Sequence, residues 1–273
     1  MNLTLEDSCW INNTTEMFWQ PHTSSVDFCE SNYLLSSYVV EFHNVWSSFV
    51  GISLFGLVGL WFNTTHEWRF SLIFGILTLV GIGSMGLHGT LHWVFQSSDE
   101  LPMIYLALTM VFCAFETTAP KGKPNYPWLP AVMFAVAAME TIIYYAFQQL
   151  WFVFLGTFSL LSVLILMAGI MYFNQASRQV QRLFFQSAGS FILLGFGSWV
   201  LDFLLCHEGV LDISNQFFIG MTPHVIWHLA AGLGGYLAGL CALAFRMECL
   251  KLPYQISHVL GVVPIVEAGK KLD

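Results

Sequence analysis

The stretch FSLIFGILTLVGIGSMGLHGTLHW, residues 70–93, contains no Asp, Glu, Lys or Arg. It is longer than the ~20 apolar residues that a helix needs to cross the hydrocarbon of a bilayer. Near its end, Ser84, His88 and His92 are spaced four apart, which on a helix places all three side chains on one face. The stretch therefore predicts a membrane-spanning helix that carries polar groups for which the rest of the chain has to supply partners.

The composition extends this interpretation to the whole chain. Of its 273 residues, 56% are hydrophobic and only 10% are charged, whereas soluble domains carry about 25% charged residues. Seven apolar segments of spanning length are joined by short connections, which predicts an all-α, integral membrane bundle of seven transmembrane helices. The expected helices cover residues 39–61, 70–93, 101–118, 128–147, 150–173, 184–206 and 222–245.

The basic residues favour one orientation of this bundle. All nine lie in every second connection or after the last helix, namely Arg69, Lys121, Lys123, Arg178, Arg182, Arg246, Lys251, Lys270 and Lys271. Since loops rich in Lys and Arg stay in the cytosol, we expect a lumenal polar segment 1–38, a transmembrane domain 39–245 and a cytosolic tail 246–273. Sequons at Asn2, Asn12 and Asn13 agree with a lumenal N-terminus.

A second pair of histidines, His224 and His228, has the same four-residue spacing at the start of the last apolar segment. In the expected orientation this pair reaches the same depth as His88. Ionisable residues inside a membrane are costly enough that a functional role is the default interpretation. A catalytic zinc ion takes three protein ligands and keeps a fourth position open. We therefore predict a metal site of three or four imidazoles, with histidines that merely pack together as the alternative.

Two carboxylates are expected at this depth. Asp99, in QSSDELPMIY (residues 96–105), either caps the following helix, whose first turn would hold Pro102, or takes a proton from a metal-activated water. The two roles are compatible. Asp202, near the lumenal end of the sixth apolar segment, either hydrogen-bonds a ligand histidine or holds an internal water.

Oxygen ligands are concentrated in SSVDFCESNY, residues 24–33, and at the head of the first helix. Asp27, Glu30, Asn32 and Glu41 supply hard donors that suit calcium rather than zinc. The spacing is not that of an EF-hand. A solvated acidic loop is the alternative to a calcium site.

Together these motifs resemble those of the alkaline ceramidases, seven-helix intramembrane hydrolases of a superfamily that includes adiponectin-receptor-like proteins. The resemblance covers residues from about 24 to 250. It rests on VDFCESNY (26–33) with EFHN (41–44), GSMGLHGTL (83–91) followed by DELPMIY (99–105), and HVIWH (224–228) before AAGLGGY (230–236).

The resemblance implies a role for each of these residues. Zinc would be bound by His88, His224 and His228, Asp99 would be the acid/base group, and Ser84 would contact the reacting oxygen. The implied calcium ligands are Asp27, Phe28, Glu30, Asn32 and Glu41. Phe28 stands where related sequences often have tryptophan, which matters little if its carbonyl is the ligand, and His92 stands where no ligand is expected.

The implied activity is hydrolysis of the ceramide amide bond to a sphingoid base and a free fatty acid. We expect a multi-pass protein of the endoplasmic reticulum or Golgi that takes ceramide from the surrounding membrane lipids and has no obligate protein partner. The net charge of −8 does not favour nucleic acid as a partner. The alternatives are a related zinc hydrolase of another lipid amide or ester, and a lipid-sensing receptor. Glu140 has no assigned role.

The six cysteines predict one bridge. Four of them are set apart because they lie inside helices, in the cytosol or far out in the N-terminal segment, namely Cys113, Cys241, Cys249 and Cys9. Cys29 and Cys206 remain, both on the oxidising side in the expected orientation, where disulfides persist. We predict a bridge between them, with two unpaired buried thiols as the alternative.

Overall fold

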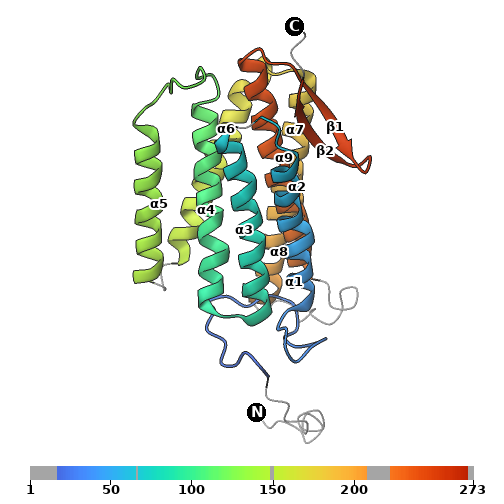
Figure 1. Ribbon diagram of the computed structural model, residues 1–273. Coiled ribbons are helices and arrows are strands. Elements are labelled where there is room, and N and C mark those ends of the chain that lie inside the picture. Colours follow the sequence, from blue (N-terminus) through green and yellow to red (C-terminus); the bar gives the residue numbers. More distant parts are fainter. Residues whose placement is uncertain (1–16, 66, 148–150, 208–221, 270–273) are drawn as a thin grey trace, which may run out of the picture.

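The computed structural model describes residues 17–65, 67–147, 151–207 and 222–269, which form a bundle of helices with one small hairpin (Figure 1). Cys9, Lys270, Lys271 and the three sequons at Asn2, Asn12 and Asn13 lie outside the described residues. In chain order the elements are α1 (Phe42–Ser48), the π-helix η1 (Phe49–Ser53), α2 (Leu54–Phe62), α3 (Trp68–Thr90), α4 (Trp93–Phe115), α5 (Leu129–Ala146), α6 (Trp151–Tyr172), the 3-10 helix η3 (Phe173–Gln175), α7 (Arg178–Ala188), the π-helix η4 (Gly189–Phe196), α8 (Gly197–Asp202), the π-helix η5 (Phe203–His207), α9 (Pro223–Cys249), β1 (Tyr254–Val259) and β2 (Val263–Ala268).

Seven helical segments of the described chain are long and apolar enough to cross a membrane, which confirms an integral membrane seven-helix bundle. α1, η1 and α2 form the first span, and α7, η4, α8 and η5 form the sixth. The spans of α3 and α9 are each 61% buried, whereas that of α6 is 6% buried. The helices that carry the predicted histidines therefore occupy the interior, while the apolar surface of α6 faces the surrounding lipid.

The expected boundary between the second and third helices is wrong. α3 ends at Thr90, because Leu91 adopts a left-handed conformation with φ 50°. His92 is the extended residue before α4, so it does not continue the face of Ser84 and His88. α4 begins at Trp93 rather than at residue 101, and Asp99 lies within it instead of capping it.

The polar run that looked like a connection is helical because its side chains are satisfied locally. The hydroxyls of Ser97 and Ser98 donate to the Val94 carbonyl, at 2.8 and 2.9 Å. Hydroxyls that bond back to the preceding turn are compatible with a helix. Pro102 lies inside α4 rather than in its first turn, so it has no N–H for the carbonyl of Ser98.

Two close approaches between helix backbones depend on glycine. A Cβ at Gly232 in α9 would lie 1.8 Å from the carbonyl oxygen of Gly51 in η1. A Cβ at Gly83 in α3 would lie 1.9 Å from the carbonyl oxygen of Ser98 in α4. Small residues at such crossings let membrane helices pack backbone to backbone. The first contact places α9 against the first span, and the second places α3 against the segment that contains Asp99.

The described basic residues all lie at one end of the bundle, opposite the N-terminal segment (Figure 1). Two of them are buried and tie helix ends together. Arg69 donates to Glu67 at 2.8 Å, and Arg246 donates to Glu67 at 3.3 Å and to the Thr117 carbonyl at 2.8 Å. Arg guanidinium groups suit this role because they donate in several directions at once.

The C-terminal region contains a hairpin that the sequence did not predict. β1 and β2 pair antiparallel, with Tyr254 opposite Ala268 and Val259 opposite Val263. An isolated two-stranded hairpin is marginal in water. Here Ile265 and Val266 are buried against the bundle, and this packing holds the hairpin in place.

We expect Gly232→Ala to lower the melting temperature of the detergent-solubilised protein. The added methyl would overlap backbone atoms, and overpacking of this kind costs roughly 1–3 kcal/mol of unfolding free energy. Gly75→Ala in α3 is the control, because its nearest neighbour is the Leu60 Cδ2 atom at 4.0 Å. Thermal unfolding followed by circular dichroism measures both. Equal melting of Gly232→Ala and the unsubstituted protein would contradict the Gly51–Gly232 contact.

Candidate metal centre

Three imidazoles from α3 and α9 meet in the interior of the bundle. One potential ligand atom from each of His88, His224 and His228 lies within 4.8 Å of the others. All three side chains are buried, with ring centroids 4.6 to 5.1 Å apart. Within the described part of the chain, this is the group of histidine, cysteine and carboxylate side chains whose geometry fits a metal ion.

The partners of the ring nitrogens determine which nitrogens are left to bind a metal. His88 Nδ1 is hydrogen-bonded to Glu41, and His228 Nδ1 lies 2.9 Å from the Ser47 hydroxyl. Since that hydroxyl donates to the Asn44 carbonyl at 3.1 Å, its oxygen accepts the proton of His228 Nδ1. A proton on Nδ1 leaves the lone pair of each ring on Nε2.

Two ring nitrogens have no protein partner among the described residues. They are His88 Nε2 and His224 Nδ1, both fully buried. A buried polar atom without a partner is uncommon and calls for an explanation such as an ion. Three imidazoles leave a fourth position open around a tetrahedral metal. The residues present therefore fit a zinc ion.

Ser84 lies beside the imidazoles, and Asp99 lies close to Ser84. The Ser84 hydroxyl is 3.4 Å from His228 Nε2 and 3.0 Å from the Ser48 hydroxyl. The Asp99 carboxyl group lies close enough to interact electrostatically with this hydroxyl. The close approach at Gly83 brings Asp99 within reach of α3. The structure thus combines a carboxyl group and a hydroxyl at the edge of the histidine cluster.

His92 and Glu140 lie outside this cluster. His92 Nε2 is 2.9 Å from the Trp19 carbonyl oxygen, so the side chain ties the N-terminal segment to the start of α4. Glu140 in α5 accepts a hydrogen bond from Thr157 in α6 at 3.2 Å. The spacing of His92 was a misleading signal, because α3 ends before it.

Asp202 holds the backbone of a predicted ligand rather than its ring. Its Oδ1 atom accepts from the His224 N–H at 3.1 Å, in the first turn of α9. Its Oδ2 atom lies 3.4 Å from the Cys29 nitrogen. A carboxylate at a helix N-terminus is electrostatically favourable, and here it also fixes where α9 begins.

The residues predicted to bind calcium gather around the start of α1. Glu30 accepts from the backbone N–H groups of His43 at 2.6 Å and Asn44 at 2.8 Å. Asn32 donates to Asp27 at 3.4 Å. Burial raises the pKa of Glu41, and the charges of Asp27 and Glu30 raise it further. Mutual repulsion of this kind favours a cation, but backbone N–H groups and His88 already occupy several of these oxygens.

Sequence reasoning missed several contacts to the imidazoles. Glu41 was assigned to calcium, yet it is the hydrogen-bond partner of His88. The Phe28 ring centroid lies 4.7 Å from that of His88 and 4.0 Å from that of His224, so this side chain covers the cluster. Asn44, Ser47 and Ser48 form a polar stripe at helical spacing in the first span. This stripe was the available signal for the contact to His228.

The described cysteines agree in part with the predicted bridge. Cys113, Cys241 and Cys249 are free thiols. Cys29 is buried, and its sulfur lies 3.3 Å from the Asp202 carbonyl oxygen. Cys206 follows Asp202 by about one helical turn, but its side chain lies outside the described residues. The Cys29–Cys206 bridge stays a prediction.

Comparison with known proteins identifies the family. A model of the ceramidase family matches residues 20–260. The chain is 31% identical to alkaline ceramidase 3 of Mus musculus, over 91% of this chain and 94% of that protein. It is 27% identical to an alkaline ceramidase of Arabidopsis thaliana, over 93% of this chain and 96% of that protein. It is also 27% identical to alkaline ceramidase YPC1 of Saccharomyces cerevisiae, over 80% of this chain and 75% of that protein. With a match of this extent, the chain belongs to the ceramidase family.

Proposed function

We propose that this protein is a zinc-dependent, intramembrane ceramidase that hydrolyses the amide bond of ceramide to a sphingoid base and a free fatty acid. The names of its relatives support ceramide as the substrate. One observation carries the mechanism: three buried imidazoles, two of which have a nitrogen without a protein partner, lie next to the Ser84 hydroxyl and the Asp99 carboxyl group.

In this proposal His88, His224 and His228 hold the metal. A bound zinc ion would supply Lewis acidity at the amide carbonyl and activate water near neutral pH. Glu41 and Ser47 keep the protons of His88 and His228 on Nδ1, so that the lone pairs face the shared site. Partners of this kind typically tune metal affinity by 10–100-fold.

Asp99 and Ser84 perform the proton and charge chemistry. Asp99 takes the proton released by the attacking water and delivers it to the nitrogen of the leaving amine. Ser84 donates its hydroxyl proton toward the developing oxyanion, and removing one such donor typically costs ~10²–10³ in rate. The Phe28 ring over the imidazoles restricts access of bulk water to this centre.

The membrane position suits a lipid substrate, because ceramide need not leave the bilayer to reach a site within the helices. The runner-up functions are hydrolysis of another lipid amide or ester with the same residues, and lipid sensing without turnover. A receptor has no need for a carboxyl group held beside a three-histidine centre. This pairing favours the enzyme.

We also infer that the basic end of the bundle is cytosolic and the metal centre lies toward the lumen of the endoplasmic reticulum or Golgi. The positive-inside bias supports this orientation, because the described basic residues cluster at the end where α9 finishes. The N-terminal residues and the predicted Cys29–Cys206 bridge would then lie on the oxidising side.

We propose calcium as a second, structural ion bound by Asp27, Glu30, Asn32, Glu41 and the carbonyl of Phe28. The repulsion that Asp27 and Glu30 exert on Glu41 supports this proposal. A cation there would relieve the repulsion and stiffen the segment that contains Phe28. Because Glu41 also contacts His88, the two metal sites would share one side chain.

Metal analysis tests the ligand assignment. We expect one zinc ion per chain in the purified protein, and its loss on changing His88, His224 or His228 to alanine, because two imidazoles hold the ion too weakly. His92→Ala is the control and should retain zinc. Zinc loss from His92→Ala but not from His88→Ala would overturn the assignment.

Release of sphingoid base from ceramide in mixed micelles tests the reaction. Asp99→Asn should lower turnover by ~10²–10⁴-fold, as expected for the loss of an acid/base group, while zinc remains bound. Ser98→Ala changes the exposed neighbouring residue and should leave turnover unchanged. A matched lipid ester distinguishes the amidase from the runner-up hydrolase. Unchanged turnover in Asp99→Asn would exclude the acid/base role.

Thermal melting tests the calcium site. Calcium should raise the melting temperature over that in a calcium chelator, since a ligand that binds only the folded state stabilises it by mass action. Asp27→Asn should reduce this difference. The zinc content of each sample has to be measured so that zinc loss is not mistaken for calcium loss. Identical melting with and without calcium would leave only an acidic loop.

A further inference from the structure

The C-terminal hairpin returns alongside the spanning helices. At its base, the Ala268 N–H donates to the Thr64 hydroxyl just beyond α2, at 2.8 Å. Farther along β2, the Pro264 carbonyl accepts from the Tyr236 hydroxyl at 2.7 Å. Tyr236 lies about 20 Å before the end of α9 at 1.5 Å per residue. The strand therefore runs from the end of the bundle toward the middle of α9.

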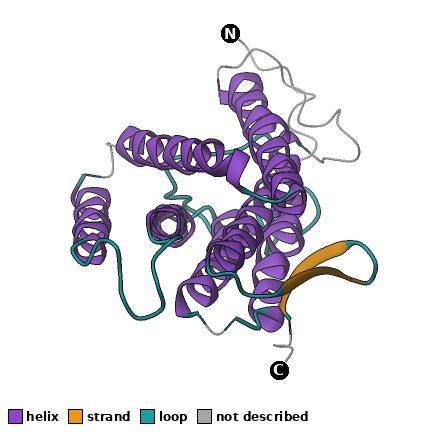
Figure 2. Ribbon diagram, turned by 90° about the horizontal axis from the view of Figure 1, so that it is seen from above, coloured by secondary structure: helices purple, strands orange, loops and turns teal. Residues whose placement is uncertain are grey.

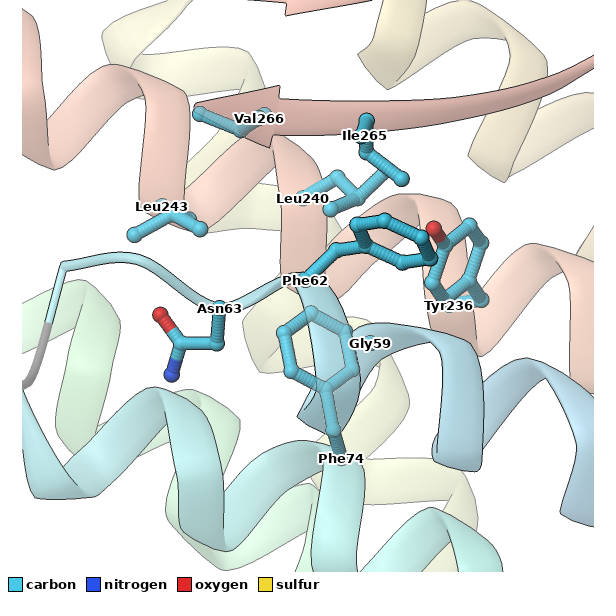
Figure 3. A pocket seen from close by; sticks show the side chains of 9 residues that line it. All are labelled: Gly59, Phe62, Asn63, Phe74, Tyr236, Leu240, Leu243, Ile265 and Val266. Carbon is cyan, nitrogen blue, oxygen red and sulfur yellow. The ribbon is translucent and has the colours of Figure 1, made fainter. Parts of the chain in front are cut away.

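The side chains of β2 between these two hydrogen bonds also pack against α9. Ile265 and Val266 line a small apolar pocket with Leu240 and Leu243 of α9 (Figure 3). In the view from above, the hairpin projects sideways from the bundle (Figure 2), and its turn lies beside the upper part of the helices rather than beyond their ends (Figure 1). The turn therefore lies beside helical segments that are apolar enough to span the bilayer.

The residues of this turn are apolar and exposed. Leu260 is 92% exposed and Val262 is 74% exposed, and they flank Gly261. Neither contributes to the packing that holds the hairpin on α9. In water, two such side chains at a projecting tip would bury nothing, whereas lipid acyl chains would surround them.

The backbone conformation of the turn gives an independent reason to place its side chains in an apolar environment. Leu260 and Gly261 both have positive φ, 53° and 74°, the combination found in type I′ turns. Asparagine is favoured at the first of these positions, and leucine there is disfavoured by the crowding of its Cβ. Asparagine would suit both this backbone and water better, so an apolar environment explains the leucine.

The surface at this end of the bundle has the character of a membrane interface. Trp61 at the end of α2 is 85% exposed, and Trp68 at the start of α3 is 64% exposed. Tryptophan is enriched at the level of the lipid headgroups. On β1, the exposed side chains of Gln255 and His258 are polar, which suits the region between the headgroups and the apolar tip.

We propose that the turn Val259–Val262 inserts into the acyl-chain region of the leaflet at the basic end of the protein. The hairpin is then an interfacial anchor that holds the C-terminal segment against α2 and α9. The occupant around the tip is lipid. A second copy of the chain or another protein covering the tip is a competing outcome of the test.

Spin labelling of the protein in lipid nanodiscs tests this proposal. Leu260→Cys and Val262→Cys would carry a nitroxide at the tip, and Gln255→Cys would carry it on the polar part of β1 as the matched control. The labelled, unsubstituted protein supplies the background from the native cysteines. Melting temperature and zinc content establish that each variant is folded. Power saturation of the electron paramagnetic resonance signal then compares how often the nitroxide collides with oxygen, which concentrates in lipid, and with a water-soluble nickel chelate.

We expect oxygen collisions to exceed nickel collisions at residues 260 and 262, and the reverse at residue 255. A higher nickel than oxygen collision rate at either tip position would place the tip in water and overturn the proposal. Low collision rates with both reagents would mean that protein covers the tip, which would overturn it as well.

Discussion

Three imidazoles packed together inside a membrane bundle constrain the rest of this structure. Charged imidazolium ions would repel one another there, and neutral rings still need a partner for each nitrogen. Glu41 and Ser47 satisfy one nitrogen each on His88 and His228, while Asp202 holds the backbone where His224 begins α9. His88 Nε2 and His224 Nδ1 are left without a protein partner in this cluster, which a metal ion would stabilise.

The helix crossings follow from the same need for proximity. The imidazoles can meet only if α3, α9 and the first span approach closely, and side chains at the crossings would hold them apart. Gly51 and Gly232 remove that obstacle between the first span and α9, and Gly83 lets α3 approach α4 in the same way. The contact at Gly83 has a chemical consequence, because it places the Asp99 carboxyl group beside the Ser84 hydroxyl.

The N-terminal segment is part of the centre rather than a separate domain. Phe28 lies on the rings of His88 and His224, and Glu41 hydrogen-bonds His88. Glu30 fixes the first turn of α1, from which the polar stripe of Asn44, Ser47 and Ser48 begins. Any ion bound by this segment would therefore influence the position of the metal ligands, because only one or two residues would separate the ion from them.

The sequence alone determined the parts that depend on local composition and spacing. Long apolar runs need lipid, so the seven spans and their order were predictable. Histidines four apart on apolar segments indicated a cluster that contains His88, His224 and His228, but the same spacing also pointed to His92, which lies outside it. Only the tertiary structure decided what depends on distant contacts. The end of α3 at Thr90, which separates His92 from the cluster, depends on one left-handed residue. The partnership of Glu41 with His88 and the return of β2 along α9 join residues far apart in the chain, and no local pattern encodes which of several carboxylates or apolar strands will meet them.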